Sequence, residues 1–277
     1  MARAGPPGGP ARPRRLIMTL YGCYGRAEDN WLSVAALIRL MGDLGVDSQA
    51  VRSSVSRLKR RGLLCSLARS GAAGYALSGT GLSVLREGDI RIFGRRRAAA
   101  GDGWVLVAFS VPEAERGKRH ELRTTLARLG FGAVAPGVWV APGTLASQAM
   151  DALGRRGLDR YADVFAAEHL GSAALAAQVR QWWDLDAIAA RYERFTAHYQ
   201  PLAAQLASGG PLPARAAFQA YIPLLASWQE LPYADPGLPL ELLPAGWAGV
   251  TAADLFSQLN GHLAEAAAAH ARSLVHR

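Results

Sequence analysis

The feature that most constrains this chain is the short basic stretch DSQAVRSSVSRLKRR, which occupies residues 47–61. Val51, Val55 and Leu58 recur at three- and four-residue spacing, so they form one apolar stripe if the stretch is helical. The opposite face would carry arginines, an amide and hydroxyls, which can contact phosphates and base edges in the major groove. A helix with these two faces packs on a small core and presents its basic side to an acidic, grooved partner. The stretch therefore predicts the second helix of a helix-turn-helix that binds DNA.

The ends of this predicted helix carry suitable boundary residues. Asp47 or Ser48 can cap its N-terminus, and Gly62 follows its last turn, where a helix end favours glycine. Gly45, in the turn before the helix, can adopt a positive φ. The helix is therefore expected to stop where the basic cluster stops.

The residues predicted to bind DNA come from this helix and from a hairpin that follows it. Arg52 and Arg57 are the leading candidates, because arginine pairs bidentately with guanine or clamps a phosphate. Gln49 and Ser53 are expected to point at bases from the start of the helix. For each cation the alternative is a solvated surface side chain. The predicted DNA-binding set is Gln49, Arg52, Ser53, Ser56, Arg57, Lys59, Arg60 and Arg69.

The positive charge of the chain is concentrated in its N-terminal third. The whole chain of 277 residues has a formal net charge of +9. Residues 1–97 hold 17 basic and 6 acidic residues, whereas residues 98–277 hold 14 basic and 16 acidic ones. A basic module joined to a nearly neutral remainder is typical of nucleic-acid-binding proteins. Because Lys59 and Lys118 are the only lysines, part of this charge can instead reflect an arginine-rich composition.

The sequence carries no signature of a secreted or membrane protein. Its two cysteines, Cys23 and Cys65, do not make a disulfide framework and favour a reducing compartment. Residues 1–15 contain no apolar core of signal-peptide length, and the apolar run at 16–21 is too short to span a bilayer. We therefore expect a cytoplasmic protein with no membrane partner.

Composition and periodicity divide the chain into four segments. Residues 1–12 contain mainly Pro, Gly, Ala and Arg and are predicted to be a disordered tail. Residues 13–97 predict helices and a β-hairpin, the pattern of a winged helix-turn-helix domain. Residues 98–180 predict the order β-α-β-β-α-β of a ferredoxin-like domain. Residues 181–277 predict mainly long helices, so the expected fold class is α+β with winged-helix, ferredoxin-like and helical parts in that order.

Motifs for catalysis are missing from the sequence. None of the six histidines lies in an H-E-x-x-H or C-x-x-C context, and no G-x-S-x-G nucleophile elbow occurs. Gly79 and Gly81 lack the third glycine and the βαβ context of a dinucleotide-binding loop. We therefore expect no enzyme activity, no catalytic residue, no metal ligand and no cofactor.

A set of short motifs follows a fixed order along the chain. It includes LIMTLYG, WLSVAALIRLMGDLGV, AVRSSVSRLKRRGLL, GYALSGTGLSVLREGDIRIF, WVLVAFSVPE and PGVWVAP, with QWWDLDAIAARYERF in the C-terminal third. This set resembles the PaaX family of bacterial transcriptional repressors, densely over residues 16–142. The resemblance implies winged-helix, ferredoxin-like and helical domains in a homodimeric repressor of aromatic (phenylacetate-type) catabolism that binds double-stranded operator DNA. It also implies release from DNA by an aryl-acyl-coenzyme A, which is phenylacetyl-coenzyme A in the best-known branch.

The implied coenzyme A ligand requires aromatic walls and cations for its phosphates. Tryptophans and arginines near the predicted domain joints meet this description, although core packing or a solvated linker is the alternative for each of them. The predicted ligand-binding set is Arg95, Arg96, Trp139, Trp183, Arg191 and Tyr192. A second hypothesis has no inducer, and the middle and C-terminal parts then serve dimerisation or a protein partner.

The predicted middle domain also resembles the ferredoxin-like nuclease subunits of CRISPR systems. Those subunits place an aspartate at the end of their first strand, where facing carboxylates can hold a divalent cation. Here Ser110 follows Phe109 at that place, and a serine does not supply the carboxylate. Metal-dependent DNA cleavage is therefore not expected.

Overall fold

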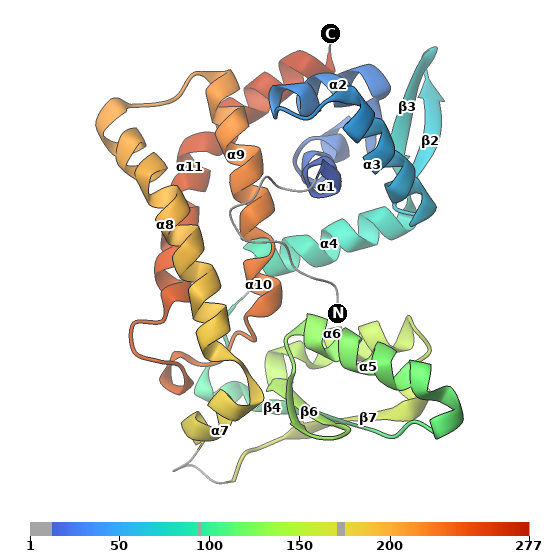
Figure 1. The fold of residues 1–277 in the computed structure, drawn as a ribbon, viewed down its shortest axis with the longest axis vertical. Coiled ribbons are helices and arrows are strands. Elements are labelled where there is room, and N and C mark those ends of the chain that lie inside the picture. The colour runs from blue at the N-terminus through green and yellow to red at the C-terminus, as the bar shows by residue number, and fades with distance from the viewer. Residues whose placement is uncertain (1–12, 94–95, 171–174, 277) are drawn as a thin grey trace. The chain divides into compact units, whose positions relative to one another are not determined.

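The computed structural model describes residues 13–93, 96–170 and 175–276, and the tail predicted at residues 1–12 lies outside this range. The chain is mixed α/β and mostly helical, with two small antiparallel sheets (Figure 1). It forms two compact units. The four segments predicted from the sequence are a different division and stay a prediction. The first unit comprises Met1–Gly94, Glu193–Gln229 and Thr251–Arg277, and the second unit comprises Arg95–Tyr192 and Glu230–Val250.

Over residues 13–93, the described N-terminal part of the first unit contains four α-helices and a three-stranded sheet with the order β1-β3-β2. The helices and the β2-β3 hairpin agree with the sequence prediction. Strand β1 is not predicted, because three residues show no clear period and its partner β3 is distant in the sequence, with Leu32 opposite Tyr75. The elements are α1 (Pro13–Cys23), a 3-10 turn (Gly25–Glu28), β1 (Trp31–Ser33), α2 (Val34–Asp43), α3 (Ser48–Arg60), β2 (Leu64–Arg69), β3 (Ala72–Leu77) and α4 (Gly79–Phe93).

The core of this part is built from the apolar faces of its first three helices. Ile17 and Leu20 of α1 are fully buried, and α1 contacts both α2 and α3. Val51, Val55 and Leu58, the stripe predicted from the sequence, are each only 2% exposed. Burial of one such side chain contributes about 1.5–3 kcal/mol. The apolar stripe therefore fixes which face of α3 is left outside.

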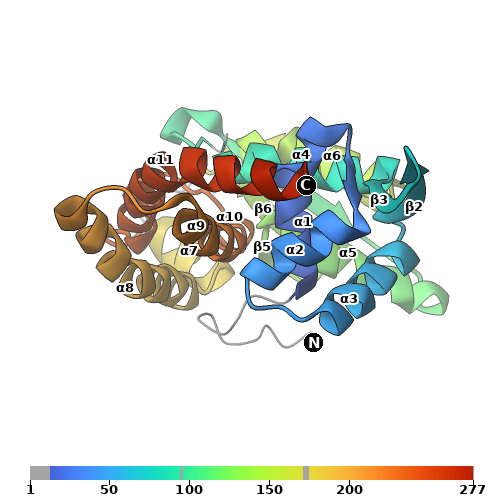
Figure 2. The same cartoon turned by 90° about the horizontal axis from the view of Figure 1, so that it is seen from above.

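Helices from the C-terminal third complete the first unit. They are α8 (Leu185–Gly209) from Glu193 onward, α9 (Ala214–Trp228) and most of α11 (Ala248–Val275). Helix α9 packs against α1, where the Thr19 hydroxyl donates to the Gln229 side-chain carbonyl at 3.3 Å. Seen from above, α9 and α11 lie beside α1 and α2 (Figure 2). The first unit thus joins segments from both ends of the chain.

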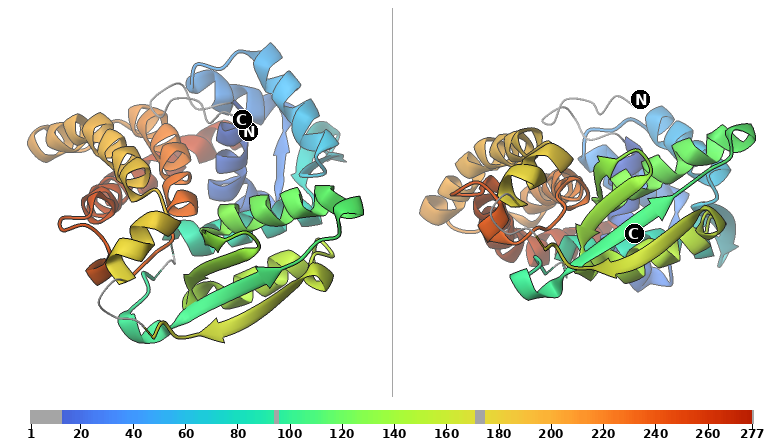
Figure 3. Two further views of the ribbon diagram at one scale, coloured as in Figure 1. Left: turned by 60° about the horizontal axis from the view of Figure 1, so that its bottom comes forward. Right: turned by 90° about the horizontal axis from the view of Figure 1, so that it is seen from below.

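The second unit is centred on a four-stranded antiparallel sheet with the order β5-β6-β4-β7. Helices α5 and α6 cover one face of this sheet (Figure 3). Val105 and Val107 of the sheet pack there against Leu122 and Leu126 of α5, and all four are fully buried. The elements are β4 (Trp104–Phe109), α5 (Arg116–Leu129), β5 (Gly132–Ala135), β6 (Val138–Pro142), α6 (Ala146–Gly154), β7 (Ala162–Ala167), α7 (Leu175–Trp182) and α10 (Leu231–Ala234).

A tryptophan that follows α7 packs against strand β5. The Trp183 indole nitrogen donates to the Gly130 carbonyl at 2.9 Å, and its ring lies over Gly132. A Cβ atom at Gly132 would approach the Trp183 ring to 2.7 Å and the Trp182 carbonyl oxygen to 2.9 Å. Glycine at this position therefore permits the close approach.

We expect Gly132→Ala to lower the free energy of unfolding by roughly 1–3 kcal/mol, because a buried ring and a backbone carbonyl must both move. The matched control is Gly117→Ala in α5, where an added Cβ meets nothing within 4 Å. That variant should be neutral or more stable by less than about 1 kcal/mol, because alanine favours a helix. Chemical denaturation of both variants measures the difference, and equal stabilities would contradict the close packing of Trp183.

Candidate nucleic-acid interface

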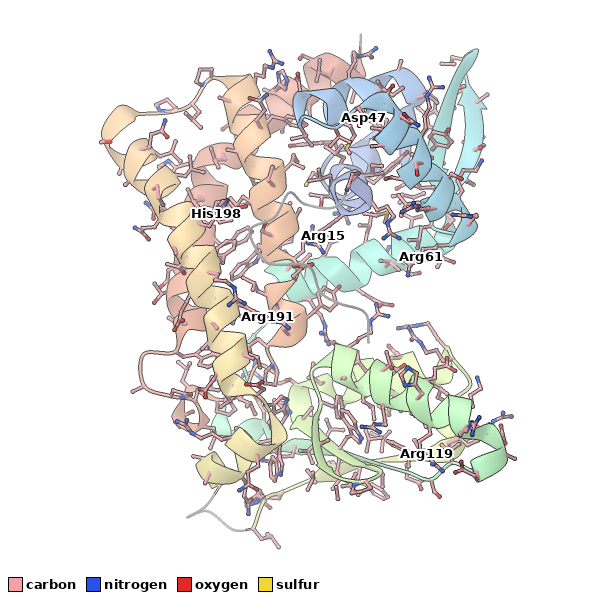
Figure 4. All side chains as sticks on the ribbon, viewed as in Figure 1. Arg15, Asp47, Arg61, Arg119, Arg191 and His198 are labelled. Atoms are coloured by element: carbon pink, nitrogen blue, oxygen red, sulfur yellow. The ribbon has the colours of Figure 1, made fainter. Side chains whose placement is uncertain are left out.

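The helix with the basic face is capped at both ends. The Asp47 carboxylate accepts a hydrogen bond from the Ala50 backbone N–H at 2.8 Å, which satisfies one of the free donors of the first turn. At the other end, Gly62 has a φ of 68°, a left-handed conformation that suits glycine. Asp47 and Arg61 mark the two ends of α3 in Figure 4. The predicted caps and boundaries of this helix are confirmed.

The outer face of α3 carries the polar residues predicted to bind DNA. Within the part of the chain that the structure describes, Arg52, Arg57 and Arg60 form no ion pair, so their guanidinium groups are available to an anion. The helix places them at the spacing of successive turns, beside an amide and two hydroxyls. The exposed residues of this face are Gln49, Arg52, Ser53, Ser56, Arg57 and Arg60.

The remaining two predicted DNA-binding residues have partners within the protein. The Lys59 ammonium donates to the Ser66 hydroxyl at 2.6 Å and lies 5.8 Å from the centre of the Tyr75 ring. The Arg69 guanidinium contacts both the carboxylate and the backbone carbonyl of Asp29, at 3.4 and 3.2 Å. Lys59 ties α3 to the β2-β3 hairpin, and Arg69 ties the hairpin to the loop before β1. Both contacts fix the hairpin beside α3.

Trp31, which is not among the residues predicted from the sequence, also holds the hairpin. Its indole nitrogen donates to the Leu67 carbonyl at 2.8 Å, and its ring lies directly over Gly74. The Arg69 guanidinium lies 5.8 Å from the same ring. An aromatic residue two positions before the helix-capping Ser33 is the signal that the sequence offers, but the partners of Trp31 are more than thirty residues away.

The residues predicted to bind a ligand all belong to the second unit. Trp139 is buried in the sheet core, and Trp183 is buried against β5. Arg191 is exposed on α8 (Figure 4). Arg95 lies outside the described residues. The two tryptophans thus serve packing in this structure, and their role in ligand binding stays a prediction.

Arg96 and Tyr192 each contact an aspartate. Arg96 is exposed and pairs with Asp102 at 2.8 Å, and this hydrogen bond, together with one from the Ala99 backbone, holds the pKa of Asp102 below its usual range. The buried Tyr192 hydroxyl donates to Asp235 at 3.0 Å. Asp235 is 2% exposed and also accepts from Arg97 at 2.9 Å and from the Gly237 backbone at 2.6 Å. A buried carboxylate is stable here because charged and neutral donors surround it.

Three family models match successive parts of the chain. The model of the PaaX-like protein matches residues 12–81, that of the PaaX protein central Cas2-like domain matches residues 97–179, and that of the PaaX-like protein C-terminal domain matches residues 183–273. Over 267 residues the chain is 30% identical to the transcriptional repressor PaaX of Escherichia coli (strain K12), and the alignment covers 94% of this chain and 83% of that protein. The chain belongs to the PaaX family.

A solved structure shares the fold of this PaaX-family chain. The uncharacterised protein Rv0674 from Mycobacterium tuberculosis matches with a TM-score of 0.57 over 92% of this chain and 97% of its own, at 23% identity. At that identity the likeness shows the fold alone.

Membership of the PaaX family confirms the family predicted from the motifs. It also agrees with the prediction that the chain is a regulator and not an enzyme, because the curated relative is a transcriptional repressor. Among the described residues, no helix is long and apolar enough to cross a membrane. In the same residues, no three His, Cys, Asp or Glu side chains gather as a metal site.

We expect Asp47→Ala to lower the free energy of unfolding by roughly 1 kcal/mol, because the Ala50 N–H loses its acceptor. Asp47→Ser keeps a capping oxygen at the same position and should retain most of the stability. Urea denaturation of the two variants gives the comparison. If alanine and serine were equally tolerated, the cap would not contribute to the stability of α3.

Proposed function

We propose that this chain is a DNA-binding transcriptional repressor of an aromatic-acid (phenylacetate-type) catabolic operon. The observation that carries this proposal is the exposed face of α3, with three arginines that no carboxylate of the described residues neutralises. The relative from Escherichia coli is a transcriptional repressor, and its alignment covers nearly the whole of this chain. Such a helix inserts in the major groove, where arginines read guanine and hydroxyls contact phosphates.

The N-terminal elements support a winged helix-turn-helix for this role. Helices α2 and α3 are joined by the turn 44–47, and the β2-β3 hairpin stands where a wing would lie. The second unit supports a ferredoxin-like middle domain, because β4, β5, β6 and β7 follow the order β-α-β-β-α-β with α5 and α6 on one face. On this basis we retain the predicted boundaries 13–97, 98–180 and 181–277 as a proposal.

The repressor is proposed to act as a homodimer on double-stranded operator DNA. Two copies of α3 would then enter successive major grooves about 34 Å apart or a multiple of it, on a palindromic operator. The basic face supplies an electrostatic part of the affinity, which falls with salt because each neutralised phosphate releases counterions.

The inducer is proposed to be an aryl-acyl-coenzyme A, phenylacetyl-coenzyme A first among them. Support for this ligand comes from the family resemblance in the sequence motifs. Arg96 and Arg191 are exposed cations of the second unit that suit its phosphates. To release DNA, the thioester must bind the conformation that does not bind DNA more tightly than the one that does.

We expect Arg52→Ala and Arg57→Ala each to weaken specific operator binding by about 1–3 kcal/mol if the residue contacts a base. A residue that contacts only phosphate should instead reduce the slope of log affinity against log salt by about 1. The matched control is Arg123→Ala, an exposed arginine on α5. Fluorescence anisotropy with the DNA upstream of the protein's own operon measures both quantities. Affinities equal to the control would remove these arginines from the interface.

Phenylacetyl-coenzyme A should raise the thermal midpoint of the protein and lower its operator affinity. A ligand that binds the native state at a hundred times its Kd stabilises that state by about 2.7 kcal/mol. Free coenzyme A and acetyl-coenzyme A are the controls for the aryl group. If no thioester changes either quantity while the operator still binds, the middle and C-terminal parts serve dimerisation or a protein partner instead.

A further inference from the structure

A cluster of polar side chains within the first unit meets at the C-terminal end of α2. Asp43 is the last residue of α2 and precedes the turn 44–47 that leads into α3. Side chains from α9 and α11 converge on it from positions 172 to 227 residues further along the chain. The cluster therefore links the C-terminal helices to the turn that sets the start of α3.

The contacts use every acceptor that Asp43 offers. One carboxylate oxygen accepts from the Arg215 guanidinium at 2.8 Å, and the other lies 2.6 Å from the His270 Nε2 atom. The Gln219 amide donates to the backbone carbonyl of Asp43 at 2.8 Å. That carbonyl is one of the last four of α2, which have no partner within their own helix. Helix α2 is thus capped by α9 and α11.

A second contact joins α2 to α11, one helical turn away from Asp43 and His270. The Arg39 guanidinium of α2 donates through Nε and Nη2 to the Leu274 carbonyl of α11, at 3.1 and 2.8 Å. That carbonyl belongs to the last turn of α11, where a cation is favourable. The His270 ring also packs on Phe218 of α9, with the ring centres 5.4 Å apart. The position of the histidine is therefore fixed by two helices.

The charge state of the cluster depends on the histidine. Partial burial raises the pKa of Asp43, but hydrogen bonds from His270 and Arg215 and their positive charges outweigh it and hold that pKa below its usual range. Asp43 is therefore ionised at neutral pH. Its side chain is 17% exposed and that of His270 is 15% exposed, so solvent screens their interaction less than at an open surface. Histidine ordinarily gains its charge between about pH 5 and pH 8.

Within the part of the chain that the structure describes, few other charged groups contact the cluster and could compensate for a change in the charge of His270. The charged groups facing His270 are Asp43 of α2 and Arg215 of α9, and Arg39 lies one turn away at Leu274. On α11 itself, the Ser273 hydroxyl donates to the His270 backbone carbonyl. His276 pairs separately with Glu28 at 3.2 Å. Asp43 thus meets one permanent cation and one titratable one.

We propose that Asp43, Arg215 and His270 are positioning residues for DNA recognition, through which α9 and α11 hold α2 and the turn 44–47 so that α3 is set for the operator. This inference rests on the proposed repressor function. The attachment is strongest when His270 is protonated and loosens as the proton is lost. Since a preordered α3 loses less conformational freedom on binding, operator affinity follows the state of the cluster.

The first test is the pH profile of operator affinity for the full-length protein at constant salt. We expect the affinity to fall about threefold to tenfold between about pH 6 and pH 8, the size expected for a partly screened ion pair. His270→Gln keeps a hydrogen-bond donor but does not titrate, so it should remove this component. His262→Gln, an exposed histidine of the same helix, should leave it intact. A profile unchanged in His270→Gln would overturn the proposal.

The second test needs no operator. Amide hydrogen exchange of residues 44–50 should be faster in Asp43→Asn than in His262→Gln, because the turn loses its attachment to α9 and α11. Equal exchange in the two variants would contradict the coupling.

If the wild-type protein binds no operator, the proposed function fails, whereas the exchange experiment still decides whether the cluster holds the turn. If Asp43→Asn does not fold, His270→Gln replaces it, and its exchange is compared with that of the wild type. Exchange in His270→Gln at about pH 6 should exceed that of the wild type, and equal exchange there would overturn the proposal.

Discussion

Burial of α1 on more than one side is the constraint on which the first unit depends. Ile17, Leu20 and Tyr21 are fully buried, and α1 contacts both α3 and α9. The Tyr21 hydroxyl donates to the Tyr75 carbonyl of β3 at 2.8 Å, and burial raises the pKa of Tyr21, so this hydroxyl keeps its proton. One apolar helix thus holds the basic helix, the hairpin and the C-terminal helices together. Close-packed interiors transmit displacement, so the C-terminal helices are connected to α3 through α1 within one core.

The cations of the α3 region have two different tasks. Lys59 and Arg69 hold the hairpin through Ser66 and Asp29, whereas the arginines on the outer face form no ion pair among the described residues. Of these two cations only Arg69 is paired with a carboxylate, and a charge neutralised in this way attracts an anion less than an unpaired one, whereas the Ser66 hydroxyl leaves the charge of Lys59 in place. The electrostatic attraction therefore rests on fewer cations than the composition suggests, but these cations stand on a rigid helix whose apolar face is buried. Rigidity matters because base reading depends on bidentate geometry, which a mobile side chain loses.

The sequence predicts what is local in this fold. Periodicity and caps locate α3 with Asp47 and Gly62 at its ends, because a helix is determined by residues three or four apart. Strand β1 and the role of Trp31 cannot be predicted from local spacing, because both depend on contacts with residues more than thirty positions away. The contact between Asp43 and His270 joins residues 227 positions apart, so the sequence around neither residue indicates it. For the candidate site, the exposed arginines follow from helical spacing, whereas the internal partners of Lys59 and Arg69 could be found only from the folded chain.

The C-terminal third contributes to both units, and in each unit an aspartate gathers donors from distant segments. Asp43 binds Arg215 and His270 in the first unit, and Asp235 binds Arg97 and Tyr192 in the second. The two differ in the chemistry of their partners. Asp235 is buried beside Arg97, which keeps its charge at every physiological pH, so removal of that arginine would leave the buried carboxylate without this cation. Asp43 is partly exposed, and one of its two cations is a histidine. The same carboxylate chemistry therefore gives the second unit a permanent attachment, and on our proposal it gives the first unit one that the loss of a single proton weakens.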